Sequence, residues 1–289
     1  MIHLVPRVAL LLAVLTLPVP SRLELRQAAN SPADLKVDGV LPAVPPGAVR
    51  FVRRSDLEQL PMVSYHVTDD ANFPKPVDIR GVPLDTLLHA LGISGGGIIV
   101  AAVCDDAYEA HYSDTYRAAH HPILVTQVNG REIHGGGRSS DDGAYGPYLV
   151  SHASFHPSYR VLGHDEEAQI PNGVVELRIL REKDVLAAIA PRGHEAPGSE
   201  IEQGYRLASQ YCFRCHNAGE YGGHKANVPW SQIANEAARD PKSFIRWVKN
   251  PQAVDATAEM PASTDYSDAM LHAVTAYFQT FAAPAQGKR

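Results

Sequence analysis

Short apolar runs dominate the first two thirds of the chain. Runs rich in β-branched residues and bounded by turn residues predict strands. Four such runs occupy residues 62–68, 97–103, 123–128 and 174–180. Asn129-Gly130 follows the third run and predicts a hairpin turn. Only residues 83–91 and 113–119 show helical spacing in this part of the chain. The pattern indicates a mostly β region of the α+β class.

Helical spacing takes over after a polar, Gly- and Pro-containing stretch at residues 192–199. Ser199 stands where an N-cap is expected, with Glu202 three residues later, which is the capping-box arrangement. Two further amphipathic segments follow at residues 240–250 and 267–281. The last third of the chain is therefore predicted to be all-α.

These patterns predict two domains with a linker between them. The β-rich domain is expected over residues 49–191, and the helical domain over residues 200–284. Residues 30–48 are rich in Pro and Gly and are expected to be an irregular lead-in. Residues 192–199 are expected to form the linker.

The N-terminus has the pattern of a secretory signal. Arg7 precedes the apolar run from Val8 to Leu15, and Pro18 and Pro20 follow it. We expect a signal peptide within residues 1–29, cleaved after Ser21 or near Ala29, and a periplasmic protein. The alternative is a retained segment that anchors the chain to the membrane.

Composition and charge exclude some partners. Of 289 residues, 45% are hydrophobic and 20% charged, which is typical of a globular protein. The net charge is −6 and no run of Lys or Arg occurs, so nucleic-acid binding is not expected. The three cysteines, Cys104, Cys212 and Cys215, are too few for a disulfide scaffold.

The most specific chemistry lies in "YCFRCHNAG", residues 211–219, which contains Cys212, Cys215 and His216. This CxxCH spacing supplies two thiols for the vinyl groups of a haem and an imidazole for its iron. A redox dithiol would be expected inside a βαβ pattern, which is missing around Cys212. A zinc site would need two further ligands, of which His224 is one candidate. The sequence favours one covalent haem c, with His216 as an axial iron ligand.

Met260 is the predicted second axial ligand. It lies in "AEMPAS", on a loop between two helical segments, with Pro261 after it. Met270 is expected in the core of a helix, and Met62 belongs to the β-rich part. His224 or His272 would give a bis-histidine site instead.

Residues 200–282 resemble a class I cytochrome c. The matching features follow in order: "EIEQGYRLASQ", "CFRCH", "VPWSQIA", a helix ending "WVKNP", "MPAS" and an aromatic-bearing final helix. The resemblance implies an all-α fold around the haem, His216 and Met260 as axial ligands, and one-electron transfer. The chain departs from the family after the haem anchor, where "GGHKANVP" replaces a common Gly-Pro pair.

The β-rich region resembles the molybdopterin-binding domain of the sulfite oxidase family. The features are "GVPLDTLL", "CDDAYEAHY", "ILVTQVNG" and "GPY", in that order, over about residues 49–181. That family binds molybdenum through a cysteine upstream of the first feature, and this chain has none there. Cys104 lies downstream, and His66 falls roughly at the ligand position. We therefore expect this fold without a molybdopterin.

Histidines are numerous in the same region, and a metal site among them is an open alternative. The histidines concerned are His111, His120, His121, His134, His152, His156 and His164. A turn after a strand is expected at Asp105, Asp106 and Tyr108, because Asp favours turns.

Three functions follow from these features. The first is a periplasmic cytochrome that relays single electrons and docks a redox partner protein on its β-rich domain, without substrate chemistry of its own. The second is a molybdopterin- or metal-dependent oxidoreductase that uses the haem as its electron exit. The third is a ligand-binding haem sensor.

Overall fold

The computed structural model describes residues 22–135, 145–153, 160–161, 164–165, 168–193 and 196–282. Residues 1–21, with most of the predicted signal segment, lie outside the described residues. So do residues 136–144 and the candidate metal ligand His156.

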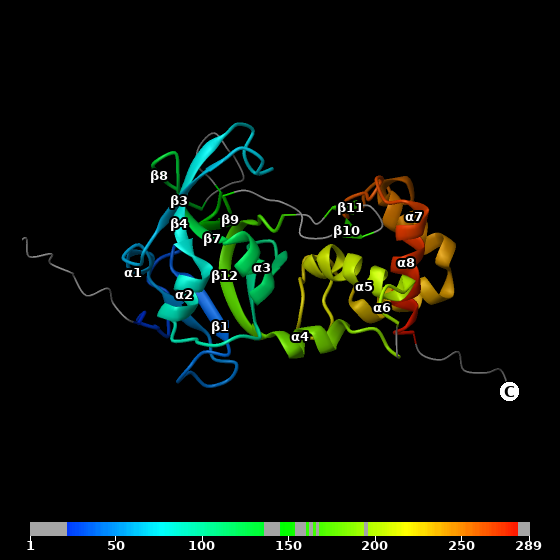
Figure 1. Cartoon of the computed structure of the whole chain (residues 1–289), viewed down its shortest axis with the longest axis horizontal. Helices are drawn as coiled ribbons and strands as arrows, with labels where there is room; N and C mark the ends of the chain where they lie inside the picture. Colours follow the sequence, from blue (N-terminus) through cyan, green and yellow to red (C-terminus); the bar gives the residue numbers. More distant parts are fainter. Residues whose placement is uncertain are drawn as a thin grey trace, which may run out of the picture.

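A large sheet fills one end of the molecule and a group of helices the other (Figure 1). The strands of this ten-stranded sheet are β1 (Leu35–Gly39), β2 (Arg50–Val52), β3 (Val63–Val67), β4 (Val77–Pro83), β5 (Ile98–Cys104), β6 (Glu109–Tyr112), β7 (Ile123–Val128), β8 (Arg131–Glu132), β9 (Tyr148–Ser151) and β12 (Asn172–Arg181). A separate pair consists of β10 (Arg160–Val161) and β11 (His164–Asp165).

Helices occur along the whole described chain. They are α1 (Arg54–Leu57), α2 (Leu84–Ala90), α3 (Asp114–His120), α4 (Glu182–Ile189), α5 (Glu200–Gln210), α6 (Trp230–Arg239), α7 (Pro241–Lys249) and α8 (Asp268–Gln279), with the 3-10 turns η1 (Cys212–Arg214) and η2 (Pro251–Ala253). Among the described residues, none of these helices is long and apolar enough to cross a membrane.

The long strand β12 organises the sheet. It pairs in parallel with β1 and antiparallel with β9 and β5, and β6 continues the sheet beyond β5. Hydrogen-bonded neighbours follow one another in the order β2-β1-β12-β9-β7-β4-β3, and β8 pairs with β7 outside this order. Strand β1 lies inside residues 30–48, the expected lead-in. The predicted hairpin is confirmed, since Val128 pairs with Arg131 across Asn129 and Gly130.

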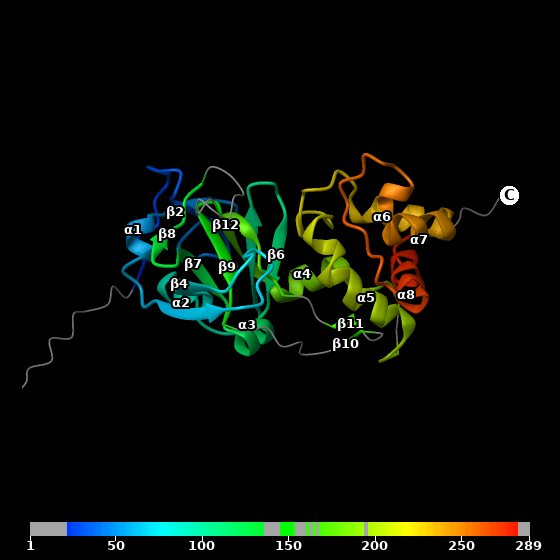
Figure 2. The same cartoon turned by 90° about the horizontal axis from the view of Figure 1, so that it is seen from above.

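Strand β5 joins the sheet to the helices through its two faces. Val100 and Ala102 belong to the core of the sheet region, which also contains α2. Ile99 and Ala101, on the other face, share a core with helix residues such as Leu207 and Phe278. Helix α4 adds Val185 and Ile189 to the same core and lies between the two groups of elements (Figures 1 and 2).

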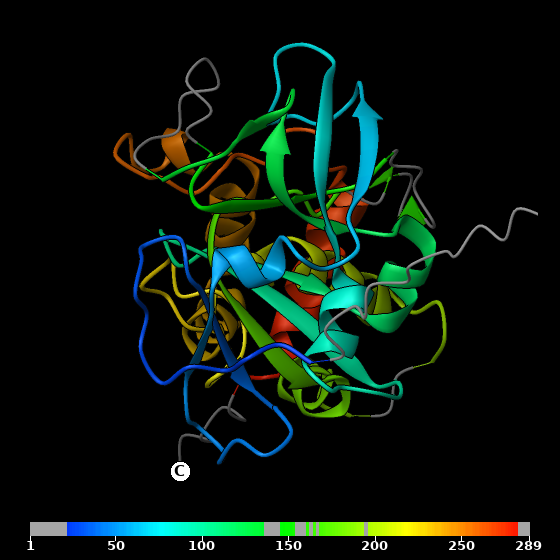
Figure 3. The same cartoon turned by 90° about the vertical axis from the view of Figure 1, so that its left-hand side faces the viewer.

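The predicted fold class is wrong. We expected a mostly β, sulfite-oxidase-like α+β domain followed by a separate all-α cytochrome c domain. The sheet is instead a mixed one of ten strands, and four helices lie in the same part of the chain. The C-terminal part is not purely helical, because Ala218 and Tyr221 form a β-bridge. Its core also takes in strand residues of β5 and β12. Figure 3 looks along the molecule from the sheet end, with the helices behind the sheet.

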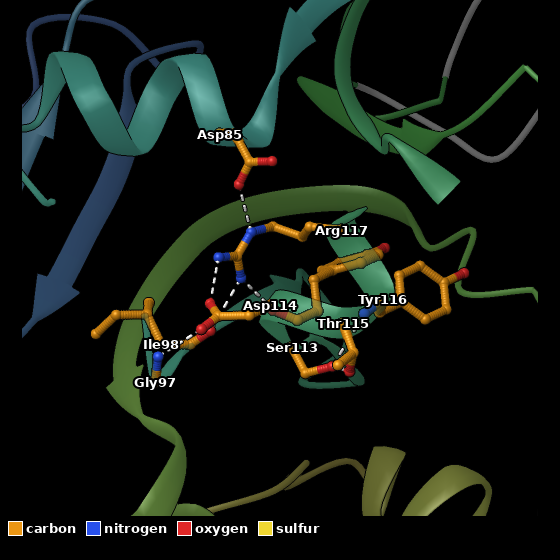
Figure 4. A network of polar contacts seen from close by, with 9 residues as sticks. Asp85, Gly97, Ile98, Ser113, Asp114, Thr115, Tyr116 and Arg117 are labelled. Atoms are coloured by element: carbon orange, nitrogen blue, oxygen red, sulfur yellow. Dashed lines mark hydrogen bonds and ion pairs between the residues drawn. The ribbon is translucent and has the colours of Figure 1, made fainter. Parts of the chain in front are cut away.

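Arg117 fastens the elements at the β6–α3 corner (Figure 4). Its guanidinium is buried and donates to Asp85 at 2.6 Å and to Asp114 at 2.7 Å. It also donates to the carbonyls of Ile98 and Tyr112, at 2.9 and 2.7 Å. One side chain therefore fixes α2, α3 and the adjoining ends of β5 and β6, and so sets the position of β6.

Helices α5 and α8 cross in close contact. Gly204 of α5 lies directly against the backbone of Ala273, where an added Cβ would collide with the Ala273 carbonyl. Ser199 caps α5 by accepting a hydrogen bond from the Glu202 amide at 3.2 Å, as the sequence predicted. This crossing brings the end of α5, and hence Cys212, onto the aromatic core of α8.

Candidate functional site

The CxxCH segment, residues 212–216, begins as the 3-10 turn η1 directly after α5. The amides of Cys215 and His216 both donate to the Cys212 carbonyl, at 3.2 and 2.9 Å. These bonds close the segment into one compact turn. The two thiols and the imidazole are thus held within a single turn of chain.

His216 is oriented by a backbone carbonyl. Its Nδ1 lies 2.7 Å from the Val228 oxygen, and because a carbonyl only accepts, Nδ1 carries the hydrogen. Val228 precedes Pro229, the N-cap of α6, so its carbonyl lies outside the helix. Burial lowers the pKa of His216, and the hydrogen bond to Val228 opposes this only in part. The ring is therefore a neutral imidazole with Nε2 as its acceptor nitrogen, the form that binds metals.

Both cysteines of the segment are unbridged thiols. Burial raises the pKa of Cys212 to about 12, and neighbouring Cys215 adds to the rise. Burial also raises the pKa of Cys215. A redox dithiol requires a cysteine whose pKa is lowered, so that a reactive thiolate forms. The raised values therefore oppose that alternative.

Phe213, between the two cysteines, anchors the segment in the core. Its ring is 2% exposed and makes an edge contact with Trp230 of α6, with centroids 5.5 Å apart. On the other side it stacks on His111 of β6, at 4.8 Å and an interplanar angle of 22°. The CxxCH segment is therefore clamped between a helix and the sheet.

Met260 lies on the loop between η2 and α8. Gln252 fixes this loop by donating to the carbonyls of Ala258 and Met260, at 2.9 and 2.8 Å. The Met260 side chain is half-buried, whereas His224 and His272, the alternative ligands, are exposed. Met270 is 2% exposed in the core around α8, as the sequence predicted.

The chain after His216 is held by the sheet region. The amide of His224 donates to the Ala107 carbonyl at 2.9 Å, and Lys225 forms an ion pair with Asp106 at 2.7 Å. Asp106 belongs to the turn between β5 and β6, which confirms the predicted turn. On its other side this stretch binds the CxxCH segment, because Ala226 donates to the Cys215 carbonyl at 3.0 Å.

Three side chains of the sheet, Glu109, His111 and Arg178, interact with one another next to the CxxCH segment. The Nε2 of His111 lies 2.7 Å from Glu109, and Glu109 forms an ion pair with Arg178 at 3.2 Å. Burial alone would raise the pKa of Glu109, but the His111 hydrogen bond and the Arg178 charge hold it below its usual range. Glu109 is therefore a buried carboxylate that accepts the Nε2 hydrogen of His111.

Two of the sheet-region histidines meet around Tyr116. The Tyr116 hydroxyl lies 3.0 Å from His152 Nε2, and the ring of His120 packs 4.5 Å from that of Tyr116. Burial lowers the pKa of His152 to about 4, with His120 adding to the effect, so His152 accepts the hydroxyl hydrogen. Within the described residues, no group of three or more His, Cys, Asp or Glu side chains is arranged to hold a metal.

Cys104, the only cysteine of the sheet region, ends β5 and is 4% exposed inside the hydrophobic core. A molybdenum ligand would have to present its sulfur to a cofactor. His66, at the other position considered, is exposed and pairs with Asp78 at 2.8 Å. Cys104 is thus enclosed by apolar side chains, and His66 bonds to a neighbouring carboxylate on the surface.

Sequence reasoning missed the residues that support the site from outside. These are Val228, Gln252, Glu109 and Arg178, while His111 enters the sequence prediction only as one candidate in a histidine metal site. Pro229 was a usable signal for Val228, because the carbonyl before a helix start is free to accept. The sheet-side residues carry no such local signal, since their contacts depend on chain segments far apart in the sequence.

No model of a known protein family matches the chain, and no curated protein sequence matches it.

Proposed function

We propose that this chain is a periplasmic c-type cytochrome that relays single electrons through one covalently attached haem. The observation that carries the proposal is the arrangement at residues 212–216. Two unbridged thiols and a neutral imidazole lie on one turn, and the Val228 carbonyl holds Nδ1 so that Nε2 is the ligand nitrogen. That donor set fits a haem joined through Cys212 and Cys215, with His216 as an axial ligand.

The chain's own residues then have defined tasks. Cys212 and Cys215 bind the haem covalently, and Phe213 keeps the turn anchored in the aromatic core. Met260, on the loop held by Gln252, is proposed as the second axial ligand. When bound, the haem supplies a one-electron couple. We propose that a redox partner protein docks on the sheet region, which directly contacts the chain around the CxxCH segment.

The proposal is tested with protein produced in a periplasm that attaches c-type haem. A spectroelectrochemical titration should show one reversible one-electron transition. The Cys212→Ala, Cys215→Ala double variant should lose the covalent chromophore. A purified, folded wild-type protein without a haem spectrum would refute the proposal, and stoichiometric molybdenum would favour the oxidoreductase instead.

A further inference from the structure

The ring of His111 forms one wall around the CxxCH segment, although it comes from the sheet. It stacks on Phe213 at 4.8 Å, while Trp230 contacts Phe213 at 5.5 Å. Phe213 directly follows Cys212 and lies two residues before Cys215, so the His111 ring packs against the middle of the CxxCH segment. The sheet region therefore contributes a side chain, His111, that contacts the CxxCH segment.

His111 is itself fixed by a buried charge. Its Nε2 bonds to Glu109 at 2.7 Å, and the Glu109 side chain is 2% exposed. The other Glu109 oxygen lies 3.2 Å from Arg178. A buried carboxylate is tolerated only when its oxygens are paired in this way.

Arg178 links the same group to the chain that follows His216. Its Nη2 donates to the carbonyl of Glu220 at 3.2 Å, and its Nε lies 3.7 Å from Asp38. Glu109 therefore supports this part of the chain at Phe213, through His111, and Arg178 supports it at Glu220.

We propose that Glu109, His111 and Arg178 are positioning residues of the haem site. They hold the CxxCH segment in place, and the charges of Glu109 and Arg178 shift the oxidation–reduction equilibrium of the haem. This inference rests on the proposed haem attachment. The oxidised iron carries one more positive charge than the reduced iron. The Glu109 carboxylate favours the oxidised state for that reason, and the Arg178 guanidinium favours the reduced state.

The test compares the midpoint potentials of two charge-neutralising variants. Glu109→Gln keeps the volume and an acceptor for His111, and it should raise the potential. Arg178→Met removes the positive charge and should lower it. At an assumed separation of about 15 Å and an effective dielectric constant of about 20, one charge changes the reduction equilibrium constant about sixfold.

Opposite signs separate a charge effect from simple loosening of the segment, which would move both potentials the same way. Glu58→Gln is the matched control, because Glu58 pairs with Arg54 in α1 at the far end of the sheet and should leave the potential unchanged (Figure 1). If Glu109→Gln does not fold, Asp38→Asn removes the second carboxylate at Arg178 and should also raise the potential. Shifts of equal sign, or shifts no larger than that of Glu58→Gln, would overturn the inference.

A second readout tests the stacking itself. His111→Phe should preserve slow hydrogen exchange of the Cys215 and His216 amides, which bond to the Cys212 carbonyl, whereas His111→Ala should accelerate it. Equal exchange in both variants would contradict the positioning role. Failure of the proposed function is recognised separately, because the unmodified protein would then carry no covalent haem.

Discussion

At the scale of single residues, the geometry of the site depends on the hydrogen-bond partner of each polar atom. Pro229 is the N-cap of α6, so the Val228 carbonyl lies before the helix and accepts from His216 Nδ1 at 2.7 Å. Burial lowers the pKa of His216 and so keeps the ring neutral. The sequence predicted His216 from CxxCH alone, whereas its orientation depends on a carbonyl twelve residues away.

Met260→Ala tests the second axial ligand. Loss of the thioether should remove the weak near-infrared sulfur-to-iron band and lower the midpoint potential, because Met ligation favours the reduced iron. Met270→Leu is the control, since Met270 is buried beside α8 and its replacement should retain the band. Absence of the band from the unmodified protein would show that Met260 is not the ligand.

His152 predicts a pH dependence of stability. Burial lowers its pKa to about 4, from the ordinary value of 6.5. The unfolded chain therefore takes up a proton before the folded protein does. The stabilisation is complete above about pH 6.5, and up to about 3 kcal/mol is lost as the pH falls to about 4.

The check is the free energy of unfolding of wild type and His152→Gln across that range. The wild type should lose more stability on acidification than the variant. Asp70, whose pKa burial raises, is present in both proteins and cancels in the difference. Parallel pH profiles would contradict the assignment.

At the scale of elements, α5 and α8 provide the base on which the CxxCH segment rests. Gly204 allows the two backbones to touch at Ala273, and the aromatic residues of α8 then pack against Phe213 through Trp230. Local signals sufficed to predict α5, because Ser199 and Glu202 form its cap. The close crossing could not be predicted, since Gly204 reads as an ordinary helix-weakening residue.

Gly204→Ala tests the crossing. Alanine favours a helix by about 1 kcal/mol over glycine, but the added Cβ meets the Ala273 carbonyl. We expect a net loss of about 1–3 kcal/mol in the free energy of unfolding. Arg206→Ala, which removes an exposed pair with Glu202 on the same helix, should cost at most about 0.5 kcal/mol. A stabilised Gly204→Ala protein would show that the helices do not approach this closely.

At the scale of the whole molecule, the sheet and the helices share a core. Ile99 and Ala101 of β5 pack with α4 and with the C-terminal helices. The β-branched run at residues 97–103 predicted a strand, but both faces of β5 are buried against different partners. The sequence did not show which elements cover each face, and the prediction of a purely helical C-terminal fold is wrong for that reason.

Ile99→Ala should therefore destabilise both parts together. The side chain is 5% exposed, and its truncation should cost about 2–5 kcal/mol. Denaturation followed by tryptophan fluorescence, from Trp230 and Trp247 in the helical part, and by far-ultraviolet circular dichroism should give one coincident transition. Leu186→Ala, at an exposed position on α4, should change stability by less than about 1 kcal/mol. Two separate transitions in the wild type would contradict the shared core.

The most direct test of the haem proposal is the intact mass of the protein after denaturation. Protein made in a periplasm with c-type haem maturation should retain the mass of one haem, because thioether bonds at Cys212 and Cys215 survive unfolding. Replacement of both cysteines by alanine should abolish this increment. A wild-type chain that unfolds to the bare polypeptide mass would contradict the account.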